Sequence, residues 1–261
     1  MIRLQRDGVV YYRFETLAGA CLVQGIFTRL GGVSQGPFAS LNVGHTVGDD
    51  PAHVEANLEL IYRALGVKAQ KVTTARQVHG DRVEMVTAMD GGRTFPETDA
   101  LITGGPGLVL LLRFADCVPV LFYAPRQRAV GLAHAGWQGT VKKIAQKTAL
   151  EMMRAYGCAP NELLVGLGPA IGPCCFEAGP EVVEALRATH PRAEELLSRV
   201  QPDGKAHVDL VQANVQQLAE VGVDRVELAE MCTSCLRHEF YSHRAEGGRT
   251  GRFAVAIGVR G

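Results

Sequence analysis

The chain has 261 residues, and its 27 lysine and arginine side chains balance 27 aspartates and glutamates, so the formal net charge is zero. Hydrophobic residues make up 47% and charged residues 21%, which is typical of a folded globular protein and excludes a disordered one. A neutral chain also lacks the basic surplus that a general nucleic-acid binder needs to displace phosphate counterions. The length is enough for a large core, and we expect a single domain over residues 1–261.

No segment of the sequence is typical of export or of membrane insertion. Residues 1–14 mix charged and apolar side chains, unlike a signal peptide, and the uncharged, largely apolar runs 16–28 and 100–112 are too short to cross a bilayer. We therefore expect a cytoplasmic protein with no membrane partner. The seven cysteines are an odd number in a chain that does not need disulfides for stability, so they indicate reduced thiols or metal ligands.

The predicted elements begin with two strands, residues 9–14 and Leu22–Phe27, which are rich in β-branched and aromatic residues. A helix follows, with Asp50 as its N-cap, Pro51 as its first residue and Gly66 just after its end. Its apolar face is formed by Val54, Leu58, Ile61 and Leu65.

Three consecutive β-rich runs come next, at residues 108–114, 118–123 and 129–133, and we expect them to form a central sheet. Thr140 is predicted to cap a second helix that ends at Gly157. The buried stripe of this helix is predicted to be Val141, Ile144, Ala145, Thr148 and Met152.

The remaining pattern predicts a strand at residues 163–167, helices that begin at Pro180 and after Asp209, and strands at Arg225–Leu228 and Phe253–Val259. Strands are consecutive in the middle of the chain and helices are grouped between them. This order favours an α+β domain with mixed β-sheets flanked by helices over a doubly wound Rossmann fold.

Four short motifs resemble known sites but lack the context that those sites need. Residues 32–36 match the G-x-S-x-G of a hydrolase, but no helix follows them. Residues 166–172 resemble a dinucleotide fingerprint with one residue too many. Residues 238–243 read H-E-x-x-x-H, one residue longer than the zinc-protease motif. Cys232 and Cys235 form a C-x-x-C without a second such motif, which we interpret as a structural thiol pair.

Three other segments place a potential metal ligand at a predicted strand end or in a loop, beside glycine or proline. These ligands are His79 in residues 76–80, Cys117 in residues 115–119 and His134 in residues 133–137. Two imidazoles and one thiolate suit zinc and leave a fourth position open for water or substrate. Copper could occupy the same three ligands, because it outcompetes zinc at nitrogen and sulfur. The long spacings are not a local metal signature, so buried structural roles for these residues stay open.

Segments along most of the chain resemble the YfiH family, also called the laccase-domain family. The matching segments are residues 28–34, 40–44, 47–51 with Asn57, 77–80, 99–103, 115–120, 134–137, 168–175 and 240–242. Two positions depart from the family pattern: Gln138 follows the tryptophan where the family usually has Arg or Lys, and His243 stands where an aromatic residue is common. The resemblance implies the family fold over the whole chain.

The resemblance also implies a zinc site made by His79, Cys117 and His134, and a chemistry of purine nucleosides. The implied reactions are phosphorolysis of adenosine, inosine, guanosine and methylthioadenosine to the base and ribose 1-phosphate, and deamination of adenosine to inosine. Zinc can lower the pKa of a bound water to about 7. The hydroxide formed in this way would attack C6 of adenine and expel ammonia.

Candidate substrate contacts follow from side-chain chemistry. Arg29, Arg76 and Arg244 are candidates for phosphate binding, since guanidinium pairs bidentately with oxyanions. Asn42 is a candidate hydrogen-bond partner of the ribose or the base, and Asp116 is a candidate proton shuttle or ligand-orienting group. Each has a structural alternative: surface arginines, an asparagine in a turn, and an aspartate that caps a turn.

Three other functions fit parts of the sequence. The first is a copper-dependent polyphenol oxidase; the eight histidines include no H-x-H pair, which argues against a multicopper centre. The second is a hydrolase that uses a Cys117–His134 nucleophilic dyad, and the resemblance links such an activity to peptidoglycan precursor editing. The third is a metal-stabilised interaction module, which would have a closed four-ligand site and no cavity beside it.

Overall fold

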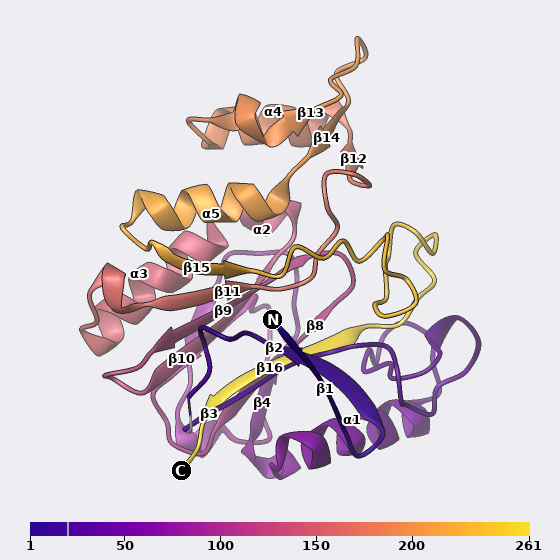
Figure 1. Cartoon of the computed structure of the whole chain (residues 1–261), viewed down its shortest axis with the longest axis vertical. Helices are drawn as coiled ribbons and strands as arrows, with labels where there is room; N and C mark the ends of the chain where they lie inside the picture. Colours follow the sequence, from indigo (N-terminus) through magenta and orange to yellow (C-terminus); the bar gives the residue numbers. More distant parts are fainter. Residues whose placement is uncertain (20) are drawn as a thin grey trace.

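The computed structural model describes residues 1–19 and 21–261, and two β-sheets packed against each other form its centre (Figure 1). In this part of the chain one sheet has seven strands, in the order β1 (Ile2–Arg6), β2 (Val9–Arg13), β3 (Leu22–Phe27), β16 (Phe253–Val259), β8 (Val109–Phe114), β4 (Val72–Ala75) and β6 (Thr94–Phe95). β4 runs parallel to β8 and to β6, and the other neighbours are antiparallel.

The second sheet has six described strands, in the order β15 (Arg225–Leu228), β11 (Leu164–Leu167), β9 (Val118–Ala124), β10 (Ala129–Ala135), β7 (Ala100–Thr103) and β5 (Val83–Met85). β11 and β15 are parallel, as are β5 and β7. A small third sheet has the order β12 (Glu177–Ala178), β14 (Ala206–Val208) and β13 (Leu197–Ser198). Both large sheets are mixed, so the structure confirms the predicted α+β class.

Helices cover the outer faces of the two large sheets (Figure 1). The α-helices of the described chain are α1 (Pro51–Leu65), α2 (Trp137–Val141), α3 (Ile144–Tyr156), α4 (Pro180–Thr189) and α5 (Leu210–Glu220). Short 3₁₀ turns lie at Gly36–Phe38, Ala69–Lys71, Ala88–Asp90, Pro160–Glu162 and Ala193–Leu196. α1 packs on the seven-stranded sheet, and α2, α3 and α5 pack on the six-stranded sheet, with α4 and the small sheet beyond α5. None of the described helices is long and apolar enough to cross a membrane.

Both faces of β8 are buried, and the strand is apolar on both faces from Val109 to Leu112. Leu110 and Leu112 point into the cluster between the sheets, whereas Val109 and Leu111 belong to the cluster under α1. Because successive side chains of a strand alternate between its faces, a strand buried on both sides must be apolar throughout. Phe114 ends the strand and stacks on Phe253 of β16, with ring centroids 6.0 Å apart.

The predicted α1 is confirmed by its cap geometry. The Asp50 side chain accepts a hydrogen bond from the backbone N–H of Ala52, and Pro51 occupies the first turn. Gly66 closes the helix in the left-handed conformation, at φ +70°.

The central sheet was predicted wrongly, because β8 does not lie beside β9. The chain leaves β8 at Phe114, turns through residues 115–117, and enters β9 in the other sheet. The second helix also begins later than predicted. Thr140 lies inside the short α2, and Lys143 takes a left-handed conformation at φ +63°, so α3 begins at Ile144. Its buried stripe from Ile144 to Met152 is as predicted.

Candidate metal centre and its cavity

His79, Cys117 and His134 lie together where the two large sheets meet. His79 is in the loop after β4, Cys117 is in the turn between β8 and β9, and His134 is on β10. One ligand atom from each of the three lies within 4.8 Å of the other two. The two imidazole rings meet edge to face, with centroids 5.0 Å apart. The fold therefore brings together three residues that are far apart in the sequence, as a metal centre requires.

Asp99 fixes two of these residues with one buried carboxylate. Its Oδ1 accepts hydrogen bonds from His134 Nδ1 at 2.9 Å and from the His79 backbone N–H at 3.0 Å. Its Oδ2 accepts from the N–H groups of Val78 and Gly80, at 3.1 Å and 2.8 Å. Because Nδ1 of His134 is occupied in this way, Nε2 is the nitrogen available for a metal. Sequence reasoning did not single out Asp99, since a carboxylate before an apolar strand carries no local signal.

Gly136 packs closely against two of the three ligands, where there is no room for a side chain. A Cβ atom built on Gly136 would lie 2.9 Å from Cys117 Sγ and 2.9 Å from His79 Cδ2. Real Cβ atoms essentially never approach other atoms so closely. The missing side chain and the mixed nitrogen and sulfur donors fit a zinc ion or another borderline-soft metal.

The electrostatics of the trio favour a thiolate. Burial alone would raise the pKa of Cys117, but the neighbouring His134 and His79 outweigh it and lower that pKa to about 6. Burial alone would lower the pKa of His134, but the Cys117 thiolate and Asp99 outweigh it and raise that pKa to about 9. Both shifts favour a thiolate on Cys117 beside a protonated His134, and the thiolate is the form that binds a metal or attacks an electrophile.

A cavity of about 780 Å³ opens beside the three ligands. This volume lies within the range of about 300–1,000 Å³ that is usual for small-molecule sites. Trp137, Ile171 and Phe176 supply apolar surface to its wall. Four arginines also line it: Arg76, Arg113, Arg244 and Arg252. Among the described residues of the wall, Asp116 is the one carboxylate, so the cavity suits a ligand with a flat ring and an anionic group.

Arg76 and Arg244, two of the three predicted phosphate contacts, line the cavity. Arg76 is exposed at the rim and pairs with Glu97 at 3.3 Å, an exposed ion pair that is weak enough to exchange for a ligand. The Arg244 guanidinium donates to the carbonyl of Glu177 at 2.8 Å and lies 5.2 Å from the centroid of the Phe176 ring.

Arg113 and Arg252 were not among the predicted site residues, although both line the cavity. Arg113 donates to the carbonyl of Val43 and to the hydroxyl of Thr74, each at 2.8 Å. The Arg252 guanidinium donates to two backbone carbonyls of its own loop. Protein acceptors hold the guanidinium groups of both arginines. Their main contribution to the cavity wall is therefore positive charge, and not free hydrogen-bond donors.

Arg29, a predicted phosphate contact, does not line the cavity. Its guanidinium donates to the carbonyls of Ala39 and Arg237 and pairs with Glu246, each at 2.9 Å. It also lies 4.5 Å from the centroid of the Tyr241 ring. These contacts use its donors to join two loops, and its side chain is only 14% exposed, so Arg29 is a largely buried structural residue and not the surface arginine of the alternative.

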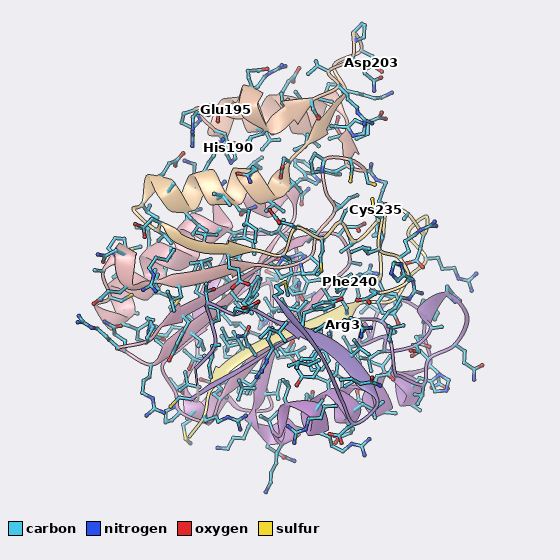
Figure 2. The ribbon with its side chains drawn as sticks, in the orientation of Figure 1. Arg3, His190, Glu195, Asp203, Cys235 and Phe240 are labelled. Carbon is cyan, nitrogen blue, oxygen red and sulfur yellow. The ribbon has the colours of Figure 1, made fainter. Side chains whose placement is uncertain are left out.

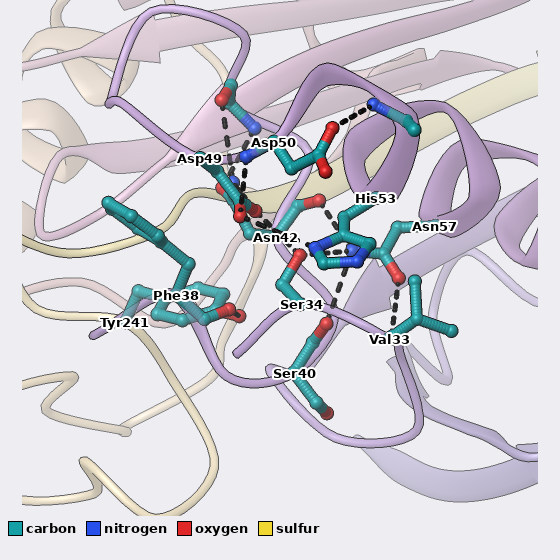
Figure 3. A network of polar contacts seen from close by, with 12 residues as sticks. Val33, Ser34, Phe38, Ser40, Asn42, Asp49, Asp50, His53, Asn57 and Tyr241 are labelled. Atoms are coloured by element: carbon teal, nitrogen blue, oxygen red, sulfur yellow. Dashed lines mark hydrogen bonds and ion pairs between the residues drawn. The ribbon is translucent and has the colours of Figure 1, made fainter. Parts of the chain in front are cut away.

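Asn42 is likewise outside the cavity wall, in the buried network of Figure 3. Its side-chain amide donates to Asp49 Oδ2 at 2.8 Å, and its Oδ1 accepts from the backbone N–H groups of Gly44 and Arg252. Gly44 and Arg252 do line the cavity. Asn42 therefore positions the wall instead of offering its own amide to a substrate.

Asp116 lines the cavity beside Cys117 but is engaged by the protein. Its Oδ1 accepts from the Thr233 hydroxyl at 2.6 Å, and its Oδ2 accepts from the backbone N–H of Arg244 at 2.7 Å. The residue has a left-handed backbone, at φ +84°. These contacts support a positioning role, in which Asp116 holds the turn that presents Cys117.

Cys232 and Cys235 are not an isolated pair as the sequence suggested. Cys174 and Cys175 lie beside them, and the four sulfur atoms are within 4.8 Å of one another. This group was not predicted, because Cys174 and Cys175 are adjacent in the chain and do not form a C-x-x-C.

The sequence is similar to a known protein family and to named bacterial proteins. A family model described as multi-copper polyphenol oxidoreductase laccase matches residues 23–260. A relative from Geobacillus stearothermophilus named purine nucleoside phosphorylase YlmD is 41% identical over 252 residues, which cover 93% of this chain and 91% of the relative. A relative from Escherichia coli strain K12 named purine nucleoside phosphorylase YfiH is 37% identical over 232 residues, which cover 88% of this chain and 90% of the relative.

The fold is also similar to solved structures. The crystal structure of YlmD from Geobacillus stearothermophilus superposes with a TM-score of 0.93 at 38% identity, covering 100% of this chain and 99% of the other. The crystal structure of the Bacillus licheniformis protein YfiH gives a TM-score of 0.92 at 34% identity, covering 99% and 98% of the two chains.

Proposed function

The chain belongs to the YfiH, or laccase-domain, family, and on that premise we propose that it is a purine nucleoside phosphorylase whose active site is the cavity beside His79, Cys117 and His134. One observation carries the proposal: the three ligands open into a cavity of about 780 Å³ that is lined by arginines and aromatic residues. We also propose that the chain is one catalytic domain acting in the cytoplasm on small molecules, with no nucleic-acid or membrane partner.

The proposed substrates are adenosine, inosine, guanosine and methylthioadenosine, each with inorganic phosphate. In phosphorolysis a phosphate oxygen forms a bond to C1′ of the ribose, the bond from C1′ to the purine nitrogen breaks, and the base leaves with a proton. Arg76 and Arg244 bind the phosphate and place it, since each can donate two hydrogen bonds to an oxyanion. Trp137 and Phe176 supply apolar surface for the purine ring.

We propose zinc as the metal of the trio, with copper as the alternative that the same ligands would accept. A bound zinc ion would act as a Lewis acid and lower the pKa of a water ligand, which is the chemistry that deamination of adenosine needs. The protein supplies the ligands in the correct orientation: Asp99 fixes the His134 ring, and Asp116 holds the turn that carries Cys117.

A second candidate function has Cys117 as a nucleophile in an amide hydrolase, for example in peptidoglycan precursor editing. The lowered pKa of Cys117 beside His134 favours it, because a thiolate–imidazolium pair is the resting state of a cysteine nucleophile. Alkylation of the zinc-loaded protein distinguishes the two. A nucleophile becomes modified and activity is lost, whereas a thiolate bound to zinc is protected.

The test of the main proposal is to incubate the metal-loaded protein with adenosine and phosphate and to separate the products by chromatography. Adenine with ribose 1-phosphate reports phosphorolysis, inosine reports deamination, and hypoxanthine reports phosphorolysis of the inosine formed. His79→Ala should lose metal and all these products together. Full turnover by a metal-free His79→Ala protein would refute the role of the trio.

A further inference from the structure

The four cysteines at positions 174, 175, 232 and 235 are brought together by the six-stranded sheet. Cys174 and Cys175 lie in the loop after β11, and Cys232 and Cys235 lie in the loop after β15. β11 and β15 are parallel neighbours, so the loops that follow them begin at the same end of the sheet. The loops continue the pairing beyond the strands, since Ala170 N–H donates to the Met231 carbonyl and Thr233 N–H donates to the Ala170 carbonyl. Figure 2 labels Cys235, which lies at one side of the molecule.

The sulfur atoms are separated as they are around a single tetrahedral ion. Cys235 Sγ lies 3.7 Å from Cys174 Sγ and 3.5 Å from Cys175 Sγ, and all four sulfurs lie within 4.8 Å of one another. With zinc–sulfur bonds of about 2.3 Å, a regular tetrahedron places its sulfurs about 3.8 Å apart. Both of these distances are far above the length of a disulfide bond, about 2.05 Å, and all four cysteines are free thiols.

A backbone donor contacts one of the four sulfurs, and two of the four cysteines are exposed. The backbone N–H of Gly172 donates to Cys232 Sγ at 3.3 Å. Cys174 and Cys235 are exposed, and Cys175 and Cys232 are half-buried. Such thiols at the surface would be open to oxidation unless an ion holds them.

We propose that Cys174, Cys175, Cys232 and Cys235 bind a structural zinc ion, separate from the metal of His79, Cys117 and His134. Four protein ligands leave no open position, which is the mark of a structural site rather than a catalytic one. A tetrahedral set of four sulfurs selects zinc or iron among the common metals. Zinc needs no redox partner and suits a site whose role is to join two loops.

The two loops joined by this ion form part of the cavity wall. Ile171, between β11 and Cys174, lines the cavity and donates its backbone N–H to the Asp116 carbonyl at 2.9 Å. Thr233, between Cys232 and Cys235, donates its hydroxyl to the Asp116 carboxylate at 2.6 Å. Asp116 precedes Cys117 directly. The proposed zinc therefore stabilises the loops that hold the Cys117 turn, although none of its ligands belongs to the trio.

Metal analysis of variants tests the site. We expect two zinc ions per chain in the wild type, one in the Cys174→Ser/Cys235→Ser variant and one in the His79→Ala/His134→Ala variant. Cys21→Ser is the matched control, because Cys21 is an exposed cysteine outside both clusters, and it should keep both ions. A Cys174→Ser/Cys235→Ser protein that keeps the wild-type zinc content would overturn the proposal. One iron per chain lost with these cysteines would overturn the zinc assignment.

Thiol labelling of the wild type tests the same site without any variant. In the native zinc-loaded protein Cys21 should react with iodoacetamide within minutes, while Cys174 and Cys235 stay unmodified despite their exposure. A chelator should then make both reactive, as peptide mass spectrometry would show. Equal labelling of Cys174, Cys235 and Cys21 before chelation would refute the site. A disulfide-linked peptide between the two loops in freshly purified protein would refute it as well.

Discussion

Replacing Asp99 by asparagine should separate the two functions of its carboxylate, which are to hold the loop of His79 and to orient His134. Each oxygen of Asp99 accepts two hydrogen bonds, and the amide of asparagine can accept on only one side. Two donors therefore lose their acceptor. Hydrogen bonds to a charged group contribute about 1.5–3 kcal/mol each, so the free energy of unfolding should fall by about 3–6 kcal/mol. At about 2 °C per kcal/mol for a chain of this size, Tm should drop by about 6–12 °C.

The metal affinity should fall as well, because loss of a partner that orients a ligating histidine usually costs about 10–100-fold. Zinc affinity is measured by competition with a chromophoric chelator, and stability by thermal unfolding of the metal-free protein. Asp50→Asn is the matched control: it removes the same charge, but asparagine caps α1 as well as aspartate does. If Asp99→Asn matched Asp50→Asn in both Tm and zinc affinity, the argument from its four hydrogen bonds would be wrong.

Three further changes test the site and its surroundings. Gly136→Ala should lower the zinc affinity at least ~10-fold in the same chelator competition, because the new Cβ would meet two of the ligands. Gly19→Ala is the control: a Cβ at Gly19 has nothing within 4 Å, so the zinc affinity should stay unchanged. Arg76→Ala should raise the KM for phosphate about 10–100-fold and leave the KM for the nucleoside near its wild-type value; an equal rise in both would contradict a phosphate contact. Burial opposes ionisation of Asp49, but its hydrogen bonds, that of Ser34 first, outweigh it and lower its pKa. Because the pKa of Asp49 is lower in the folded protein, its ionisation stabilises the fold above pH ~4, and this stabilisation is lost as the pH falls through the folded-state pKa. In Asp49→Asn the free energy of unfolding should therefore depend less on pH below pH ~4 than in the wild type.

The elements that were predicted well are those whose signals lie within the element. Asp50, Pro51 and Gly66 mark both ends of α1, and each acts through neighbours a few residues away. β15 and β16 have the predicted bounds. The start of α3 could not be predicted in the same way. Thr140 is a good capping residue, yet it lies within α2, where its hydroxyl accepts a hydrogen bond from Asn214 of α5.

Sheet membership depends on contacts that no local pattern encodes. β8 and β9 are adjacent in the sequence and equally apolar, and the turn at residues 115–117 decides that they enter different sheets. The site shows the same division. His79, Cys117 and His134 were proposed from their residue types and from the family resemblance, and the fold brings them together. Asp99 and the pairing of the two cysteine loops depend on the arrangement of strands in space, so they required the structure.

The ligand trio has one consequence for the assembly of the protein. Its members come from both large sheets: His79 follows a strand of one, His134 belongs to a strand of the other, and Cys117 lies in the link between them. A metal ion held by all three would cross-link the two halves of the sandwich, and the site would exist only after the sheets have docked. Metal binding would then be among the last events of folding. A metal bound by all three ligands would be present only in molecules whose two sheets have packed as in the native structure.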